Sequence, residues 1–294
     1  MLAAVLLCGG KGSRMIAGGV DTHKPLLEVG GMPSTRFVIE GLLGGNLDFS
    51  QFIVVVPPGR ESEYEEALAG LGCRIVVQEY ALGTGNAVYD SLEHLLAPIE
   101  HVYVSFGTQP LVRTETIEGS LDVHLKQDLG FTLATVIMDN PYAPLLRDES
   151  GRVCGSVETH LEGAEMPAHG ETNIGAYWAS RSALEIVLSG LHEELFVVEE
   201  NRYATNSGEL GVPNEMVRGC LSSNLGVEGV PIGATGTTLV DVLQVGGPAR
   251  PVDDAAGSRA AREGLVVDRA AFSALTEAAK AFLVSEAILD GIED

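Results

Sequence analysis

Short apolar runs alternate with helical patterns along the first 140 residues, and this alternation restricts the fold more than any other feature of the chain. The apolar runs are 2–8, 52–58, 74–79, 101–106 and 131–139. Apolar runs of this length are typical of strands buried on both faces of a parallel sheet. Helical patterns lie between them at 34–44, 61–71, 85–96 and 114–127. This order predicts an α/β fold with a doubly wound, mostly parallel, Rossmann-like sheet.

The rhythm changes after residue 140. Segments 151–159 and 173–181 have the character of strands in a mixed or antiparallel part, and 183–196 and 214–223 have helical patterns. A glycine-rich stretch then leads to an alanine-rich tail. We predict one domain over residues 1–257, with halves at about 1–130 and 131–257, followed by a helical C-terminal extension over 258–294.

Composition excludes several classes of function. The chain has 294 residues, of which 45% are hydrophobic, and a net charge of -23 from 41 acidic and 18 basic residues. Such a surface repels nucleic acid and anionic membranes, because binding phosphates requires clustered lysine and arginine. The four cysteines form no CxxC pair, and no apolar stretch reaches 18 residues. We therefore expect a cytoplasmic protein with reduced thiols.

A glycine-rich loop follows the first apolar run, in the segment GGKGSRM at 9–15. Glycines allow backbone N–H groups to approach phosphate oxygens, and cations neutralise their charge. The first twenty residues contain no acid but carry Lys11 and Arg14, and Lys24 follows. The GxGxxG fingerprint is absent, because Met15 stands where its last glycine would be. The GxxxxGK[ST] fingerprint is absent too, because Lys11 is followed by Gly12 and not by serine or threonine. The loop indicates phosphate binding, and the alternative is an ordinary strand-to-helix turn with incidental cations.

Several motifs in order resemble the sugar-1-phosphate nucleotidyltransferase family. GGKGSRM is followed by THKPLLEVGGMPSTRFVIEGL at 22–42, and Gln78 with ALGTGNAV at 81–88 is similar to the QxxxLGTGHAV stretch of N-acetylglucosamine-1-phosphate uridylyltransferases. GRVCGSVE, ETNIGAYWASRSAL and PVDDAAGSRAARE extend the resemblance to about residues 2–263. The family's reaction is attack of a phosphate-monoester oxygen on the α-phosphorus of a nucleoside triphosphate, which expels pyrophosphate.

The resemblance implies a role for each matching residue. Arg14 would grip the pyrophosphate, and Lys24 would lie against the α-phosphate and the incoming phosphate. The loop that would wrap the triphosphate comprises Gly9, Gly10, Lys11, Gly12 and Ser13. Gln78 and the Gly83 backbone would read the base edge, supported by Thr84. Glu158 and Asn173 would hydrogen-bond the acceptor, whereas His23 is interpreted as a solvated loop residue.

The turn after the fourth apolar run departs from the family pattern. The family usually reads GDxPL there and binds magnesium through the aspartate, whereas this chain reads GTQPL, with Gly107 followed by Thr108. A neutral hydroxyl is a poor replacement for a carboxylate at Mg²⁺. The second metal position survives as Asp253. Mg²⁺ is thus the expected cofactor at an atypical site, and the alternatives are neutralisation mainly by lysine and arginine, or a nucleotide-binding protein that has lost catalysis.

The segment NPYAPLLRD at 140–148 also departs from the family's NPTGYGRI. Ala143 falls where a glycine approaches the sugar, so the acceptor is expected to differ from ordinary N-acetylglucosamine-1-phosphate. Candidates are another sugar phosphate, a cyclitol phosphate, or a small phosphate or phosphonate.

We therefore predict a nucleotidyltransferase that uses UTP as first choice, with CTP or dTTP next. Its partners would be the triphosphate and a small phosphorylated acceptor, and the alanine-rich final helix could be a homodimer contact. A catalytically weak or inactive regulatory or scaffold subunit on the same fold is the alternative. A glycosyltransferase ranks last, because no DxD motif follows the fourth apolar run.

Overall fold

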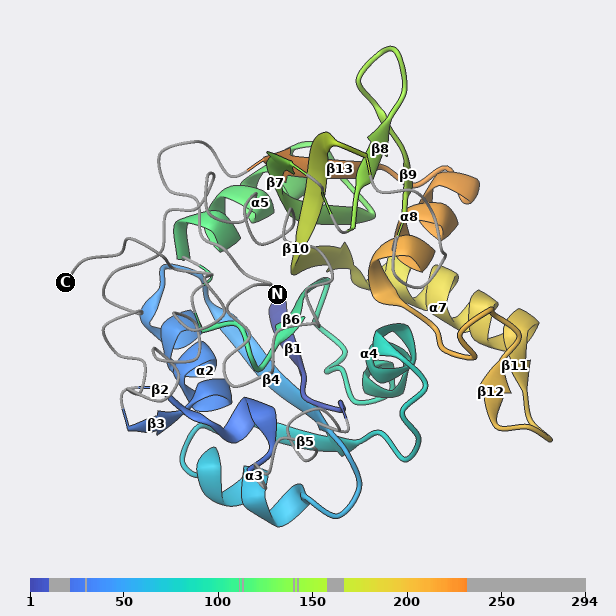
Figure 1. Cartoon of the computed structure of the whole chain (residues 1–294). Helices are drawn as coiled ribbons and strands as arrows, with labels where there is room; N and C mark the ends of the chain where they lie inside the picture. Colours follow the sequence, from blue (N-terminus) through green and yellow to red (C-terminus); the bar gives the residue numbers. More distant parts are fainter. Residues whose placement is uncertain are drawn as a thin grey trace.

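The computed structural model describes residues 1–10, 22–29, 31–110, 112, 114–139, 141, 143–157 and 167–231. Its centre is a seven-stranded sheet in the order β13-β7-β10-β6-β1-β4-β5 (Figure 1). The strands are β1 (Leu2–Leu7), β4 (Phe49–Val56), β5 (Arg74–Val77), β6 (His101–Phe106), β7 (Phe131–Asp139), β10 (His169–Ser180) and β13 (Val227–Pro231). The predicted extension over 258–294 lies outside the described residues.

The sheet is parallel except for one strand. β1 pairs in parallel with both β4 and β6, β4 with β5, and β13 with β7. β10 runs antiparallel between β6 and β7. The predicted mostly parallel, doubly wound sheet is confirmed, and the antiparallel character expected after residue 140 enters the middle of this same sheet.

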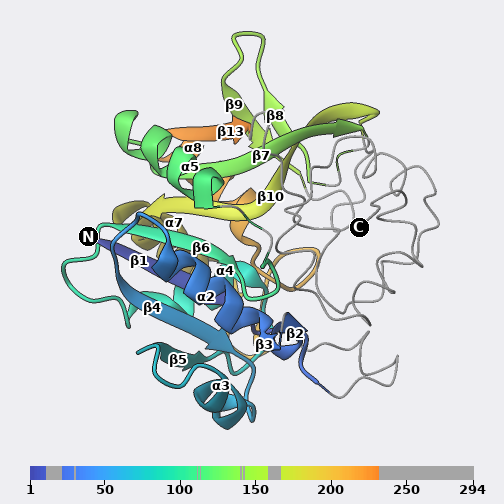
Figure 2. The same ribbon diagram turned by 90° about the vertical axis from the view of Figure 1, so that its left-hand side faces the viewer.

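Helices cover both faces of the sheet. They are α2 (Ser34–Gly44), α3 (Glu61–Ala67), α4 (Thr84–Leu92), α5 (Thr114–Lys126), α7 (Arg181–Leu195) and α8 (Val212–Ser222), with a short 3₁₀ helix η1 (Lys24–Leu26). Figures 1 and 2 show α2 and α5 on one face and α4 and α7 on the other. Crossover helices on both faces are what a parallel sheet requires to bury its two apolar surfaces.

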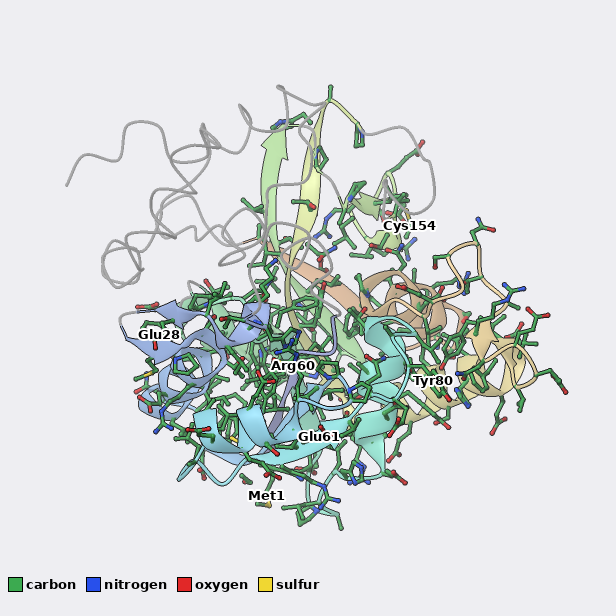
Figure 3. All side chains as sticks on the ribbon, turned by 60° about the horizontal axis from the view of Figure 1, so that its bottom comes forward. Met1, Glu28, Arg60, Glu61, Tyr80 and Cys154 are labelled. Atoms are coloured by element: carbon green, nitrogen blue, oxygen red, sulfur yellow. The ribbon has the colours of Figure 1, made fainter. Side chains whose placement is uncertain are left out.

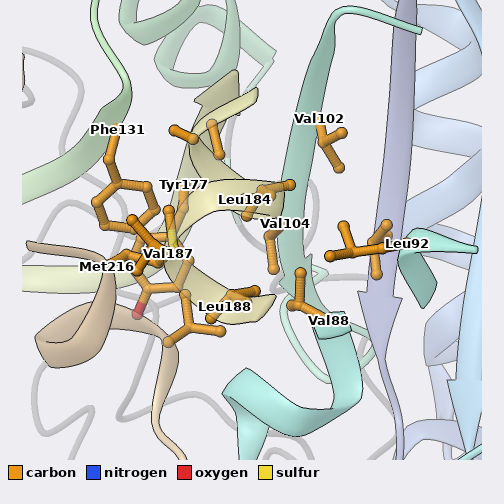
Figure 4. Close-up of a cluster of buried hydrophobic side chains, with 14 of the residues drawn as sticks. Val88, Leu92, Val102, Val104, Phe131, Tyr177, Leu184, Val187, Leu188 and Met216 are labelled. Atoms are coloured by element: carbon orange, nitrogen blue, oxygen red, sulfur yellow. The ribbon is translucent and has the colours of Figure 1, made fainter. Parts of the chain in front are cut away.

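The alternation of side chains along β1 divides the core in two. Ala3, Val5 and Leu7 pack into a cluster with α4, α7 and α8, part of which is shown in Figure 4. Ala4, Leu6 and Cys8 face the opposite way, into a cluster with α2, α3 and α5. Because successive side chains of a strand point to opposite faces, an uninterrupted apolar run supplies both clusters.

Local signals explain where α7 begins and where α3 ends. α2 has the predicted bounds, and α7 begins after Ser180, whose side chain accepts a hydrogen bond from the N–H of Ala183. α3 was predicted to reach residue 71, but it ends at Ala67, before Gly70, which has a φ of 86°. A left-handed backbone conformation terminates a helix, and glycine adopts it at the lowest cost.

Three short antiparallel pairs surround the sheet. They are β2 (Glu28–Val29) with β3 (Met32–Pro33), β8 (Leu145–Arg147) with β9 (Val153–Ser156), and β11 (Phe196–Val197) with β12 (Arg202–Tyr203). Figure 1 shows the β8–β9 and β11–β12 hairpins projecting from the body of the domain. Among the described residues, no helix has the length and apolar character needed to span a bilayer.

Candidate functional site

The carboxyl end of β1 lies at the point where the strand order reverses. β1 stands between β4 and β6, so the connections on its two sides leave in opposite directions. Ligands of open α/β sheets bind in the crevice at such a switch point, outside the carboxyl ends of the strands. The loop after β1 begins there with Gly9 and Gly10. Two further predicted residues lie at the same edge of the sheet, since Gly107 follows the adjacent strand β6 and Gln78 follows β5, beyond β4.

Gly9 and Gln78 touch each other at this edge. A Cβ atom added to Gly9 would overlap the side-chain oxygen Oε1 of Gln78, so only glycine leaves room for that amide. Both residues line a pocket of about 250 Å³, together with Pro57, Pro58, Arg60, Glu79 and Ala81. Arg60, labelled in Figure 3, comes from the turn between β4 and α3. The pocket has room for a small planar group, since sites for whole drug-sized ligands are usually 300–1,000 Å³.

Internal hydrogen bonds hold the Gln78 side chain. Its Nε2 donates to the carbonyl oxygen of Gly83 at 3.0 Å and to Oδ1 of Asn86 at 2.9 Å. Only 4% of Gln78 is exposed, although glutamine is most often found on the protein surface. Its role in reading a base stays a prediction.

Gly83 and Thr84 dock the start of α4 onto the segment before α8. Gly83 has a φ of 95°, and a Cβ there would collide with the backbone of Leu210. The Thr84 hydroxyl accepts the N–H of Val212 at 2.9 Å, and Gly85 N–H donates to Leu210 at 2.7 Å. The structure thus gives Gly83 and Thr84 a packing role, and their contacts with a nucleotide stay a prediction.

His23 holds the glycine-rich loop at Gly10. Its Nε2 donates to the Gly10 carbonyl oxygen at 2.6 Å, and its Nδ1 lies 2.7 Å from the hydroxyl of Tyr64 on α3. Burial lowers the pKa of His23, which is only 5% exposed. The interpretation of His23 as a solvated loop residue was therefore wrong, because the sequence did not reveal that α3 would cover it. Lys24 follows, half-buried, as the first residue of η1.

Gly107 and Thr108 lie in a tightly packed turn after β6. A Cβ on Gly107 would overlap Cys8 Sγ and Thr35 Oγ1, and its carbonyl oxygen accepts a hydrogen bond from Ser34 Oγ at 2.9 Å. Thr108 is 7% exposed. The next residue, Gln109, donates from Nε2 to the Ile174 carbonyl oxygen on β10 at 3.1 Å, and its Oε1 accepts from Ser105. The turn is thereby tied to the antiparallel strand.

The structure brings together two of the three predicted acceptor residues. Both the backbone N–H and Nδ2 of Asn173 donate to the Ala143 carbonyl oxygen, at 3.2 and 3.3 Å. Asn173 Oδ1 accepts from the hydroxyl of Tyr177 at 2.7 Å. Asn173 is 4% exposed and Ala143 is 5% exposed, so they form one wall beside the irregularity in β10.

The remaining predicted residues lie outside the part of the chain that the structure describes. They are Lys11, Gly12, Ser13, Arg14, Glu158 and Asp253. Within the described ranges, no three His, Cys, Asp or Glu side chains gather as a metal site, and Thr108 offers only a neutral hydroxyl. The described donors therefore do not fit Mg²⁺, which prefers carboxylate and other hard oxygen ligands.

Sequence reasoning missed the residues that support Gln78. Asn86 stands inside the quoted motif ALGTGNAV, where the resembled stretch has histidine, so that substitution was a visible signal. Its Nδ2 lies 3.2 Å from Asp90 Oδ1 and 3.3 Å from the hydroxyl of Tyr203. Tyr203 lies 117 positions further along the chain, and no local pattern pointed to it.

Comparisons with known proteins agree with this architecture. Residues 4–164 match the MobA-like NTP transferase domain. The "Bifunctional protein GlmU" of Syntrophomonas wolfei is 32% identical over 178 residues, which are 60% of this chain and 38% of that protein. The protein of the same name from Nitratidesulfovibrio vulgaris is 34% identical over 191 residues, or 64% and 40%. This chain thus spans well under half the length of these relatives.

Solved structures share the fold at low sequence identity. The inositol-1-phosphate CTP transferase from T. maritima has a TM-score of 0.56 at 14% identity, covering 78% of this chain and 84% of that one. A Bacillus anthracis structure in complex with a sucrose has a TM-score of 0.60 at 15% identity, covering 79% and 87%. These similarities show the same α/β arrangement.

Proposed function

Because this chain belongs to the MobA-like NTP transferase domain family, we propose that it is a nucleotidyltransferase that acts on a small phosphorylated acceptor. It transfers a nucleoside monophosphate from a triphosphate to a sugar-1-phosphate or a similar phosphate or phosphonate, and releases pyrophosphate. One observation carries the proposal: the glycine-rich loop after β1 opens at the switch point of the sheet, beside the pocket that Gly9 and Gln78 share.

The chemistry needs positioning and charge neutralisation rather than a covalent intermediate with the protein. An acceptor oxygen forms a bond to the α-phosphorus, and the bond from that phosphorus to the bridging oxygen breaks, so that pyrophosphate leaves with the electron pair. In the proposal, Arg14 and Lys24 neutralise the developing charge, and N–H groups of Gly9 to Ser13 surround the phosphates. Gln78 and Gly83 face the base, and Ala143, Glu158 and Asn173 face the acceptor.

UTP is the first choice of donor, with CTP or dTTP next. The resemblance of Gln78 and ALGTGNAV to the uridylyltransferase motif supports UTP. The structural neighbour from T. maritima is named a CTP transferase, which is a statement about that protein and keeps CTP in the test.

Mg²⁺ remains part of the proposal through Asp253, with Thr108 acting only through water. No step is assigned to the ion, because the described residues supply no carboxylate at the Thr108 position. The buried Thr108 also motivates the second candidate, a subunit that binds nucleotide without turnover. If the chain is such a binding subunit, we expect Thr108→Asp to make nucleotide binding depend on the metal.

The first experiment is thermal unfolding with ATP, GTP, CTP, UTP and dTTP, each with and without Mg²⁺. A ligand at about 100 times its dissociation constant stabilises a protein by roughly 2.7 kcal/mol, which is readily measured. We expect one triphosphate to raise the unfolding temperature most. Pyrophosphate release with a panel of acceptors then tests turnover.

Arg14→Ala is the decisive variant for catalysis. We expect it to abolish turnover while the unfolding temperature without ligand stays close to that of the parent. An unchanged rate would contradict the catalytic proposal, and binding without turnover for every acceptor would favour the sensing subunit. No stabilisation by any nucleotide would contradict both.

A further inference from the structure

The orientation of the Gln78 amide is dictated by its neighbours. Nε2 lies 3.0 Å from the Gly83 carbonyl oxygen, a group that can only accept hydrogen bonds. If the amide were turned over, Oε1 would face that oxygen and two acceptors would repel each other. The observed orientation leaves Oε1 on the side of Gly9, against the Cα of that glycine and at the wall of the pocket.

A second acceptor reinforces this orientation through Asn86. Oδ1 of Asn86 accepts from Gln78 Nε2 at 2.9 Å, and its Nδ2 donates to Asp90 Oδ1 at 3.2 Å and to the Tyr203 hydroxyl oxygen at 3.3 Å. An ionised Asp90 can only accept, so it fixes the orientation of Asn86, and Asn86 in turn fixes that of Gln78. Burial raises the pKa of Asp90 to about 6, which leaves it ionised at neutral pH.

The far end of this chain of hydrogen bonds is also held. The Tyr203 hydroxyl lies 2.8 Å from Nδ1 of His192, and burial lowers the pKa of that histidine. A neutral His192 can therefore accept a hydrogen bond from the Tyr203 hydroxyl. The Tyr203 oxygen is then left to accept a hydrogen bond from Asn86. The His192 ring stacks against Tyr89, with centroids 4.2 Å apart, and against Phe196 at 4.7 Å.

Gln78 Oε1 itself accepts no hydrogen bond from the residues that the structure describes. The side chain is nevertheless 96% buried, since its exposed fraction is 4%. Gln78 Oε1 is not one of the fully buried side-chain atoms that lack a partner in the described residues, so solvent can reach it at the pocket wall. A ligand group that displaces this solvent has to supply a hydrogen of its own, because an acceptor left unpaired on burial costs about 1–3 kcal/mol.

We propose that Asn86, held by Asp90 and Tyr203, is a positioning residue that fixes Gln78 Oε1 toward the pocket and makes the site select bases with a ring N–H. This rests on the proposed nucleotide site. Uracil and thymine carry a ring N–H at N3, and guanine carries one at N1. Cytosine and adenine have an unprotonated ring nitrogen at the same edge, whose lone pair would face the lone pairs of Oε1.

The test compares triphosphates of equal ring size. Dissociation constants for UTP against CTP, and for GTP against ATP, are measured by calorimetry or thermal stabilisation on the full-length protein. We expect the parent protein to prefer the base with the ring N–H in both pairs, by roughly tenfold or more for the pyrimidines. Tighter binding of CTP than of UTP would overturn the inference.

Asn86→Leu removes all three hydrogen bonds of the Asn86 amide and keeps a similar volume. We expect the ratio of UTP to CTP affinity to fall to within about threefold, because Gln78 Nε2 then keeps only the Gly83 carbonyl as an acceptor and the amide loses its alignment. Asn86→His should restore the preference, since a neutral imidazole accepts at one nitrogen and donates to Asp90 from the other. If Asn86→Leu does not fold, the double variant Asp90→Ala/Tyr203→Phe carries the same prediction, because it removes both acceptors that hold the Asn86 amide.

Tyr203→Phe is the matched control. It removes the hydroxyl but leaves Asp90 to hold Asn86, so the protein should lose stability while the affinity ratio stays within about twofold of the parent. A ratio that is unchanged in Asn86→Leu would overturn the positioning role alone. Absence of binding by any triphosphate would overturn the proposed function as well, so the two failures are distinguishable.

Discussion

His23 makes two hydrogen bonds, and its lowered pKa favours the neutral ring. Because Nε2 donates to the Gly10 carbonyl oxygen, Nδ1 of the neutral ring is unprotonated and accepts a hydrogen bond from the Tyr64 hydroxyl. Burial is the main reason that its pKa is lowered, which agrees with this tautomer. A single imidazole thereby connects α3 to the first turn of the glycine-rich loop.

His23→Leu should weaken triphosphate binding by about tenfold, because the Gly10 carbonyl loses its donor and the loop loses its anchor. Affinity measured by calorimetry is the readout. Tyr64→Phe is the control, since it removes the second hydrogen bond but leaves the bond to Gly10. Both variants should lose about 1–2 kcal/mol of stability, but only His23→Leu should lose affinity. Equal losses of affinity would contradict the anchoring role.

His124 predicts a pH dependence of stability. It is fully buried, its Nδ1 lies 2.9 Å from the Thr132 hydroxyl, and burial lowers its pKa to about 4. The unfolded chain binds this proton near the ordinary pKa of 6.5, whereas the folded chain does not. The stabilisation from keeping His124 neutral should therefore be fully present above about pH 6.5. The free energy of unfolding should fall as the pH drops toward 4, by an amount on the order of 3 kcal/mol.

The measurement compares denaturant unfolding of the parent and His124→Gln between pH 4 and pH 7. The variant should show a shallower loss of stability on acidification. Asp90 acts in the opposite sense, because burial raises its pKa from 3.8 to about 6. Its contribution to the free energy of unfolding therefore falls as the pH rises through that range. That contribution is common to both proteins and cancels in the difference, and equal slopes would contradict the role of His124.

At the scale of elements, the start of α4 is held by a segment more than 120 residues away. Leu82 accepts from Leu210 N–H at 2.8 Å, Gly85 donates to Leu210 at 2.7 Å, and Thr84 accepts from Val212. Because Gly83 also accepts from Gln78, this contact joins the pocket to the N-terminus of α8.

Gly83→Ala should be strongly destabilising, by about 2 kcal/mol or more. The added Cβ meets the Leu210 backbone, and the φ of 95° is strained for any residue with a side chain. Gly41→Ala on the exposed face of α2 is the control, since a Cβ there meets nothing within 4 Å. Gly41→Ala should stabilise the protein by up to about 1 kcal/mol. Chemical denaturation measures both, and similar effects at the two sites would refute the packing argument.

At the scale of the whole molecule, Arg147 joins three segments that are distant in sequence. From β8 it pairs with both carboxylate oxygens of Glu171 on β10, at 2.6 and 3.0 Å, and with Glu228 on β13 at 2.7 Å. The guanidinium also donates to the Gly229 carbonyl oxygen at 2.9 Å. Paired and forked hydrogen bonds of this kind are stronger than an isolated surface pair.

Arg147→Met should lower stability by about 2 kcal/mol, because it leaves the Glu171 side chain, only 10% exposed, without its charge partner. Adding Glu171→Gln should recover part of the loss. Lys126→Met breaks an exposed pair with Asp122, 71% and 58% exposed, and should cost no more than about 0.5 kcal/mol. The unfolding midpoint in urea is the readout, and equal losses for Arg147→Met and Lys126→Met would contradict this account.

Much of the fold could be predicted from local pattern. The bounds of β6, β7 and α2 agree with the sequence prediction, and the apolar run of β1 correctly indicated a strand buried on both faces of a parallel sheet. The glycine-rich loop was correctly placed after that strand. Short segments such as β11 and β12, two residues each, carry no detectable period and were missed.

The sequence by itself determined the order of the elements, the fold class and the position of the glycine-rich loop. These depend on hydrophobic period and turn residues within a few positions of one another. Only the tertiary structure decided that β10 enters the sheet antiparallel, that α3 covers His23, and that Tyr203 reaches Asn86. The physical reason is that hydrogen-bond partners and burial depend on which distant segments pack together, and local periodicity carries no record of that choice.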